Sequence, residues 1–145
     1  MDYKKAALEV LQNVGGEENV ISIMSCFTRV RVEVKDKDKV NDAQIKKIEG
    51  CQGLNWASNT IQIIFGGKCN DVYDELPELI FGKTRSGCIV NYRYVSRVDK
   101  NNVWCKRGVD GTEIRLDLGR GRYNDFMTDY TEYITSERGK SRRLW

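Results

Sequence analysis

The chain has no histidine among its 145 residues, a single proline (Pro77) and no long apolar run. Without histidine it lacks the imidazole that serves as a general base, as a metal ligand or as a phosphohistidine. No segment approaches the roughly 20 apolar residues that a membrane-spanning helix needs. The N-terminal sequence MDYKKAALEV contains no apolar stretch of signal-peptide length. We therefore expect a cytoplasmic protein, membrane-associated only through a partner.

Hydrophobic residues make up 40% of the sequence and charged residues 31%, which is typical of a globular protein and not of a disordered one. The five cysteines contain no C-x-x-C pair, so the usual spacing of a zinc site is missing. In a cytoplasmic protein we expect these thiols to be reduced. The composition predicts neither a bound metal nor a cofactor.

Charge divides the chain into two halves. Residues 1–80 carry 10 basic and 13 acidic side chains, a net charge of −3, whereas residues 81–145 carry 14 basic and 8 acidic ones, a net charge of +6. The change coincides with the sequence GKTRSG at residues 82–87, whose glycines are typical of a boundary. We predict two domains, residues 1–81 and residues 82–145.

The first half alternates between helical and strand patterns. Apolar residues at helical spacing predict helices near residues 2–14, 41–48 and 70–80, and β-branched or alternating runs predict strands near residues 19–24, 29–35, 54–57 and 60–65. The order α-β-β-α-β-β-α predicts an α+β fold, with a mostly antiparallel four-stranded sheet and three helices on one face.

The second half predicts a small β-β-β-α extension. Its strand-like segments are residues 88–98, 103–107 and 112–118, and an amphipathic helix follows over residues 123–134. At about 64 residues, it is close to the lower limit for an independent hydrophobic core.

The candidate chemistry lies around Cys26, in a short loop between the first two predicted strands. Arg29 and Arg31 are two residues apart on the second strand, so both side chains lie on its polar face. Guanidinium groups beside a thiol favour the nucleophilic thiolate and would stabilise a phosphoryl group. Thr28 adds a hydroxyl to the loop. The alternative is an ordinary structural cysteine beside a solvated strand face, and one cysteine near two arginines does not decide between the two.

The segment Cys26-Phe-Thr-Arg-Val-Arg31 resembles the Cys-x-Thr-Arg-Leu-Arg signature of IIB domains in the bacterial sugar phosphotransferase system, glucose and β-glucoside superfamily. The resemblance covers about residues 3–80. Further segments similar to the family, in the same order, are Leu8–Asn19, Lys39–Asn41 with Ile45 and Ile48, Gly50–Gly53, Ile61–Gly66 and Asp71–Glu75.

The resemblance implies a phosphocysteine carrier. A phosphohistidine on a IIA domain would pass its phosphoryl group to Cys26, which would donate it to a sugar bound by a membrane IIC partner. Arg29 and Arg31 match the paired arginines that would orient and neutralise the phosphoryl group, and Thr28 matches the threonine of the motif. Gln62 either faces the cysteine loop or only fills its strand.

The resemblance does not explain the second half. Tyr92, Tyr94 and Trp104 stand among basic residues, as in a nucleic-acid surface, but such residues also build small β cores. The alternatives are a nucleic-acid surface, a docking site for an acidic protein, or a packing extension. Three hypotheses for the chain follow. It is a phosphoryl carrier, or a regulator whose IIB domain reports its phosphorylation state to the basic half. The third hypothesis is a degenerate IIB domain that serves only in assembly.

Overall fold

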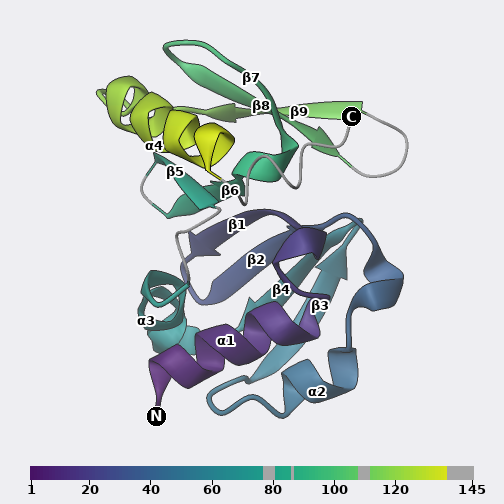
Figure 1. Ribbon diagram of the computed structural model, residues 1–145. Helices are drawn as coiled ribbons and strands as arrows, with labels where there is room; N and C mark the ends of the chain where they lie inside the picture. Colours follow the sequence, from purple (N-terminus) through teal and green to yellow (C-terminus); the bar gives the residue numbers. More distant parts are fainter. Residues whose placement is uncertain (77–80, 86, 108–111, 137–145) are drawn as a thin grey trace. The chain divides into compact units, whose positions relative to one another are not determined.

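A computed structural model describes residues 1–76, 81–85, 87–107 and 112–136 (Figure 1). The chain forms two compact units, Met1–Leu76 and Pro77–Trp145. The predicted domain boundary between residues 81 and 82 falls within a strand of the second unit. The division of the chain into domains at that point stays a prediction. Among the described residues, no helix has both the length and the apolar character needed to cross a membrane.

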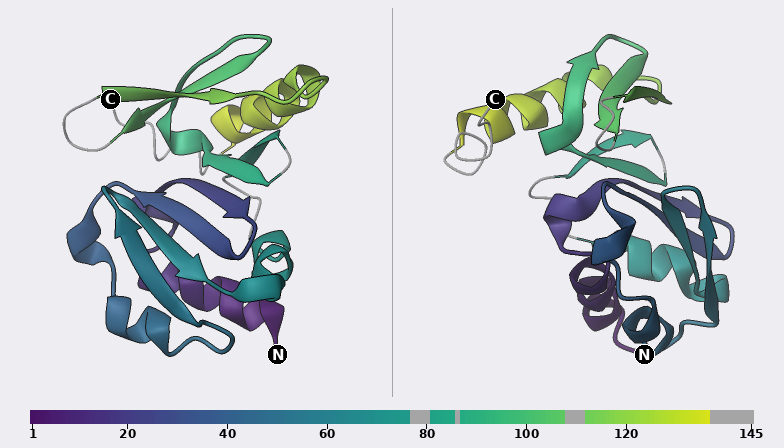
Figure 2. Two further views of the ribbon diagram at one scale, coloured as in Figure 1. Left: turned by 180° about the vertical axis from the view of Figure 1, so that it is seen from behind. Right: turned by 90° about the vertical axis from the view of Figure 1, so that its right-hand side faces the viewer.

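The first unit is a four-stranded antiparallel sheet with its helices on one face, as Figures 1 and 2 show. The strand order is β3-β4-β2-β1. Its elements are α1 (Tyr3–Asn13), β1 (Val20–Cys26), β2 (Arg29–Val34), α2 (Asp42–Lys46), β3 (Gly53–Ala57), β4 (Thr60–Ile64) and α3 (Cys69–Asp74). This confirms the predicted α+β class and the order α-β-β-α-β-β-α, although α3 ends earlier than predicted and residues 77–80 lie outside the described residues.

Local chemistry sets the ends of these elements. Asp2 caps α1 by accepting a hydrogen bond from the Lys5 amide at 3.0 Å, and Asn41 caps α2 by accepting one from the Gln44 amide at 3.2 Å. Alternate residues of β2 and β4 point toward the helices, where Val30, Val32, Ile61 and Ile63 are fully buried. The opposite face of the sheet therefore receives the polar residues of β2.

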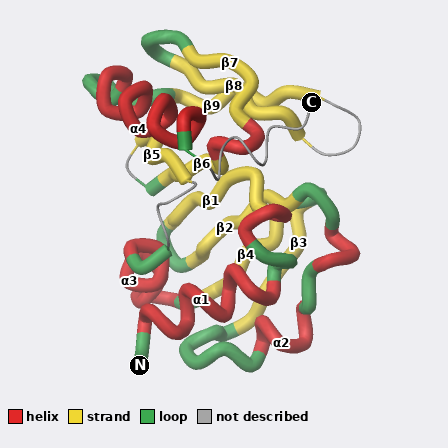
Figure 3. Tube along the Cα trace, viewed as in Figure 1, coloured by secondary structure: helices red, strands yellow, loops and turns green. Residues whose placement is uncertain are grey.

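The second unit contains a β-hairpin, a separate three-stranded antiparallel sheet and one long helix (Figure 3). Its elements are β5 (Phe81–Arg85), β6 (Cys88–Asn91), η4 (Tyr92–Tyr94), β7 (Val95–Val98), β8 (Asn102–Arg107), β9 (Thr112–Asp117) and α4 (Tyr123–Thr135). The last three strands follow the order β7-β8-β9, and α4 contacts β5.

One prediction for this unit was wrong in detail. Residues 88–98 do not form one strand, because the Asn91 side chain accepts a hydrogen bond from the Arg93 amide at 2.9 Å and starts the 3₁₀ turn η4. Residues 81–85, for which the sequence analysis predicts no strand, form β5. The segments near residues 103–107 and 112–118 and the final helix are present, as β8, β9 and α4.

Gly82 is a packing residue and not a linker residue. A Cβ atom at this position would lie 2.3 Å from a ring carbon of Tyr92 and 2.7 Å from one of Phe126. The two rings meet edge to face, with centroids 5.6 Å apart, and both are buried. Only a residue without a side chain fits between β5 and this aromatic pair.

We expect Gly82→Ala to lower the free energy of unfolding of the second unit by about 1–3 kcal/mol, because the added methyl group overpacks a filled core. Gly67→Ala is the matched control, since a Cβ there meets nothing within 4 Å. Thermal unfolding of both variants checks this. Equal stability of the two variants would contradict the packing role of Gly82.

We also expect residues 1–76 to fold alone, since they hold a complete sheet and its helices. The measurement is a thermal transition of this fragment beside that of the full chain. A fragment that melts without cooperativity would show that the two units need one another.

Candidate functional site

Cys26 is the last residue of β1, and it lies directly opposite Arg29, the first residue of β2. Two residues, Phe27 and Thr28, connect the strands as a tight hairpin loop. Residues opposite one another in an antiparallel ladder project from the same face. The Cys26 thiol and the Arg29 guanidinium therefore share the sheet face opposite the helices.

Arg31 lies on the same face, one pleat repeat further along β2, opposite Met24 of β1. On its other side Arg31 is paired with Gln62 of β4. The Nε atom of Arg31 is buried and, within the described part of the chain, has no hydrogen-bond partner. Two cationic side chains thus follow the thiol along one strand, as the alternating sequence predicts.

Gln62 orients the first of these arginines. Its side-chain oxygen Oε1 accepts a hydrogen bond from Nη1 of Arg29. In the ladder Gln62 lies opposite Arg31 and diagonal to Arg29. Its side chain therefore reaches past its direct partner to contact Arg29, the arginine nearer the thiol. This supports the first of the two interpretations of Gln62, in which it faces the cysteine loop, and gives it a positioning role.

The loop backbone is held at both ends. The Thr28 carbonyl accepts hydrogen bonds from the amides of Phe65, at 2.9 Å, and Gly66, at 3.1 Å. On the helix side, the Ser25 hydroxyl donates to Oδ1 of Asn70 and lies 3.3 Å from the sulfur of Cys69. The sheet and the start of α3 therefore fix the chain on both sides of Cys26.

The tip of the loop is exposed and strained. Phe27 has a φ of +51°, in the left-handed region that residues other than glycine rarely adopt. Its side chain is 94% exposed, the Thr28 side chain is also exposed, and Cys26 itself is half-buried. A partner protein can therefore reach the thiol from solvent. Backbone strain of this kind concentrates at functional sites.

The other four cysteines are less suited to group transfer. Cys51 is half-buried and donates its S–H to the Gly53 carbonyl at 3.4 Å. Cys69, Cys88 and Cys105 are buried. Burial raises the pKa of the Cys88 thiol, against the smaller opposing effects of Thr84 and Arg85. Among the described residues, Cys26 is the one cysteine that is not buried and also has an arginine directly across the ladder.

Comparison with known proteins places this site in a family. The family model for phosphotransferase system, EIIB, matches residues 9–41, which include the loop and both arginines. The sucrose-specific EIIBC component of Bacillus subtilis is 43% identical over 75 residues, which are 51% of this chain and 16% of that protein. The first half of this chain belongs to the EIIB family of the phosphotransferase system. The resemblance noted from the sequence is thereby confirmed.

The chain is also similar to other proteins whose names place them in the phosphotransferase system. The β-glucoside-specific EIIBCA component of Halalkalibacterium halodurans is 35% identical over 79 residues, covering 54% of this chain and 12% of that protein. One solved domain of a IIabc component from Clostridium difficile is 43% identical, covering 50% of this chain and 77% of that one, with a TM-score of 0.48. The chain thus spans less than a fifth of the length of these two curated relatives.

Proposed function

We propose that the chain is a phosphocysteine carrier of a sugar phosphotransferase system, with Cys26 as the group that is phosphorylated. The observation that carries the proposal is the pairing of an accessible thiol with Arg29, directly opposite it in a IIB domain. Arg31 supplies a second positive charge on the same face. A phosphoryl group on sulfur would meet both guanidinium groups, and charge-assisted hydrogen bonds to its oxygens would stabilise it.

The first transfer accepts the phosphoryl group from a phosphohistidine of a IIA domain. The Cys26 sulfur, having lost its proton, attacks phosphorus in line with the P–N bond. The S–P bond forms as the P–N bond breaks, and the imidazole keeps the electron pair and takes up a proton. Reactions of this type need positioning and charge stabilisation more than covalent help from the protein.

The second transfer returns the sulfur to its starting state. A sugar hydroxyl, held by a membrane IIC partner, attacks the phosphorus, loses its proton and displaces the Cys26 thiolate. The names EIIBC and EIIBCA join the B component to C and A components in the relatives, which supports IIA and IIC as partners. Thr28, exposed at the loop tip, lies where it would contact either partner.

The test is phosphoryl transfer from a phosphorylated IIA protein to the full chain. We expect label on this chain, carried as S-phosphocysteine and not as phosphohistidine, since the chain has no histidine. A chain that takes up no label from any IIA donor of the glucose or β-glucoside type would overturn the proposal.

A further inference from the structure

Phe27 forms the tip of the hairpin loop between β1 and β2, one residue after Cys26, and its side chain is 94% exposed. The other large hydrophobic side chains that are exposed among the described residues, Met1 and Leu8, are 37% and 49% exposed. A single exposed apolar residue is common on protein surfaces and marks no binding site by itself. Backbone conformation, a fixed loop and the neighbouring thiol set Phe27 apart.

The backbone at this position suits glycine better than phenylalanine. A φ of +51° lies in the left-handed region, which glycine adopts without steric cost and which disfavours any residue that has a Cβ. The ring stays almost wholly in solvent, so burial of its surface does not offset that cost. Phe27 therefore contributes little to the stability of the folded chain, and strain of this kind is typical of functional sites.

The loop is fixed where the chain leaves its tip. The Thr28 carbonyl accepts hydrogen bonds from the amides of Phe65, at 2.9 Å, and Gly66, at 3.1 Å. These bonds tie the residue after Phe27 to the segment that follows β4. A side chain on a fixed loop loses less conformational freedom on binding than one on a mobile loop, so a smaller part of its binding free energy is lost to ordering.

Glycines leave room beside the loop. The hydrogen bond to Thr28 places Gly66 next to the loop, and Gly67 follows it. Neither residue has a side chain, and a Cβ on Gly67 would meet nothing within 4 Å. A protein surface can therefore come close to Phe27 from this side, with no side chain of these two residues in its way.

We propose that Phe27 is the apolar anchor by which this chain docks on the IIA domain that phosphorylates Cys26, an inference that rests on the proposed carrier function. Transfer requires the reacting atoms to lie about 3–3.5 Å apart. The donor surface around its phosphohistidine must therefore cover the residue next to Cys26. Aromatic side chains that enter apolar pockets supply much of the binding energy of protein interfaces, so the matching feature of the donor is an apolar pocket beside its phosphohistidine.

The chemistry of the two transfers favours the IIA donor over the IIC partner as the protein that receives the ring. In the first transfer the phosphoryl group leaves a side chain of the donor protein, so two protein surfaces meet directly at the thiol. In the second transfer the attacking oxygen belongs to a sugar, which lies between the IIC protein and the phosphorus. Close contact between Phe27 and a partner's surface is therefore a requirement of the first transfer.

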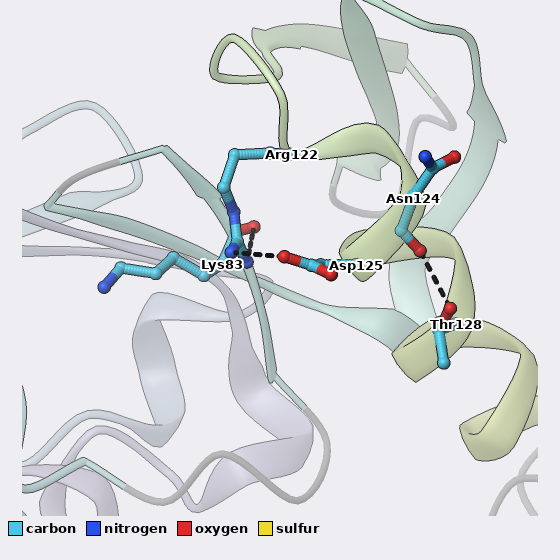
Figure 4. Close-up of polar contacts among 5 residues, drawn as sticks. All are labelled: Lys83, Arg122, Asn124, Asp125 and Thr128. Carbon is cyan, nitrogen blue, oxygen red and sulfur yellow. Dashed lines mark hydrogen bonds and ion pairs between the residues drawn. The ribbon is translucent and has the colours of Figure 1, made fainter.

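The second unit presents no anchor of this kind among its described residues, none of whose large hydrophobic side chains is exposed. The polar groups where α4 begins are engaged within the unit. Nη2 of Arg122 donates to the Lys83 carbonyl at 3.1 Å, and Nη1 lies 3.6 Å from Oδ2 of Asp125 (Figure 4). This guanidinium holds the start of α4 against β5, so the contacts of Arg122 have a structural role that needs no partner protein.

The experiment measures the initial rate of phosphoryl acceptance by the full chain at increasing concentrations of a phosphorylated IIA protein of the glucose or β-glucoside type. Phe27→Gly is expected to raise the half-saturating donor concentration at least about tenfold, because it removes a central anchor. The rate at saturating donor should stay within about twofold, since Cys26 and its arginines are unchanged. The melting temperature should change little, because relief of the strained φ offsets the added freedom of glycine in the unfolded chain.

Two further variants separate the loss of an apolar anchor from other effects. Phe27→Leu keeps the strained backbone and an apolar side chain, and its half-saturating donor concentration should stay within about threefold of wild type. Leu8→Ala is the matched control, since it truncates an exposed hydrophobic side chain on α1, on the other side of the sheet from Cys26. Its half-saturating donor concentration should stay within about twofold of wild type.

Three results would overturn the proposal. An unchanged half-saturating concentration in Phe27→Gly would mean that the IIA donor does not receive the ring. A loss only in the rate at saturating donor would make Phe27 a residue that shapes the loop, and an equal loss in Leu8→Ala would point to a general effect. If wild type accepts label in each case, the carrier function stands while the docking role fails. A wild-type chain that accepts no label refutes both.

Discussion

Cys26→Ser is expected to abolish phosphoryl acceptance from a IIA donor while changing the free energy of unfolding by less than about 1 kcal/mol. A serine hydroxyl is almost wholly protonated at neutral pH, and the chain has no histidine to activate it. The side chain lies half-buried at the end of β1, so the exchange of sulfur for oxygen disturbs little packing.

Cys51→Ser is the matched control, because Cys51 is the other half-buried cysteine and belongs to the same unit. It should accept label at the wild-type rate, since its S–H is engaged with the Gly53 carbonyl and Cys51 precedes β3, outside the strand that carries Arg29 and Arg31. Label that persists in Cys26→Ser and disappears in Cys51→Ser would move the acceptor to Cys51.

The sequence predicts the core of this site because its signals are local. Strict alternation in residues 29–35 places Arg29 and Arg31 on one face, and the two-residue loop alone brings Cys26 opposite Arg29. Whether these residues carry the chemistry is a prediction that only transfer experiments test. Their placement, by contrast, follows from strand periodicity and a tight turn.

The role of Gln62 is not visible in the sequence, because the bond that positions Arg29 joins residues 33 positions apart. The packing role of Gly82 is likewise not visible in the sequence. A glycine beside charged residues is typical of a linker, but its neighbours in space are the rings of Tyr92 and Phe126, which only the folded chain brings together. Contacts of this kind depend on the tertiary fold and carry no local signal.

A side-chain hydrogen bond explains the difference between the predicted strand over residues 88–98 and the observed structure. Residues 88–98 have the composition of one long strand, yet a single asparagine side chain competes with the ladder for the Arg93 amide and turns the chain. Side chains of Asn, Asp, Ser and Thr often compete in this way, and their success depends on whether the ladder continues. Here two short strands, β6 and β7, replace the long one.

Arg29→Gln and Arg31→Gln are each expected to slow phosphoryl transfer through Cys26 by about ten- to a hundredfold. A dianionic phosphoryl group loses a charge-assisted hydrogen bond worth roughly 1.5–3 kcal/mol, and this loss appears in the rate if the bond forms in the transition state. The folding cost should be at most about 1 kcal/mol, because both side chains lie on the partly exposed polar face of β2.

The two variants should differ in the first transfer. Arg29 lies directly across from Cys26 and is oriented by Gln62, whereas Arg31 lies about 6.6 Å further along the strand. We therefore expect the larger loss in acceptance from the IIA donor for Arg29→Gln, with Arg31→Gln affecting donation to sugar at least as strongly as acceptance. Single-turnover transfer in each direction, beside a melting curve, measures both effects.

Lys46→Gln provides the control for the arginine variants, since it removes one positive charge from an exposed position on α2, outside the loop. Its transfer rates should stay within about twofold of wild type, because an exposed charge at a distance from the thiol is screened by salt. If the arginine variants transfer as fast as Lys46→Gln, then Arg29 and Arg31 are only the solvated side of a strand. The thiol would then have to react without electrostatic help from its own sheet.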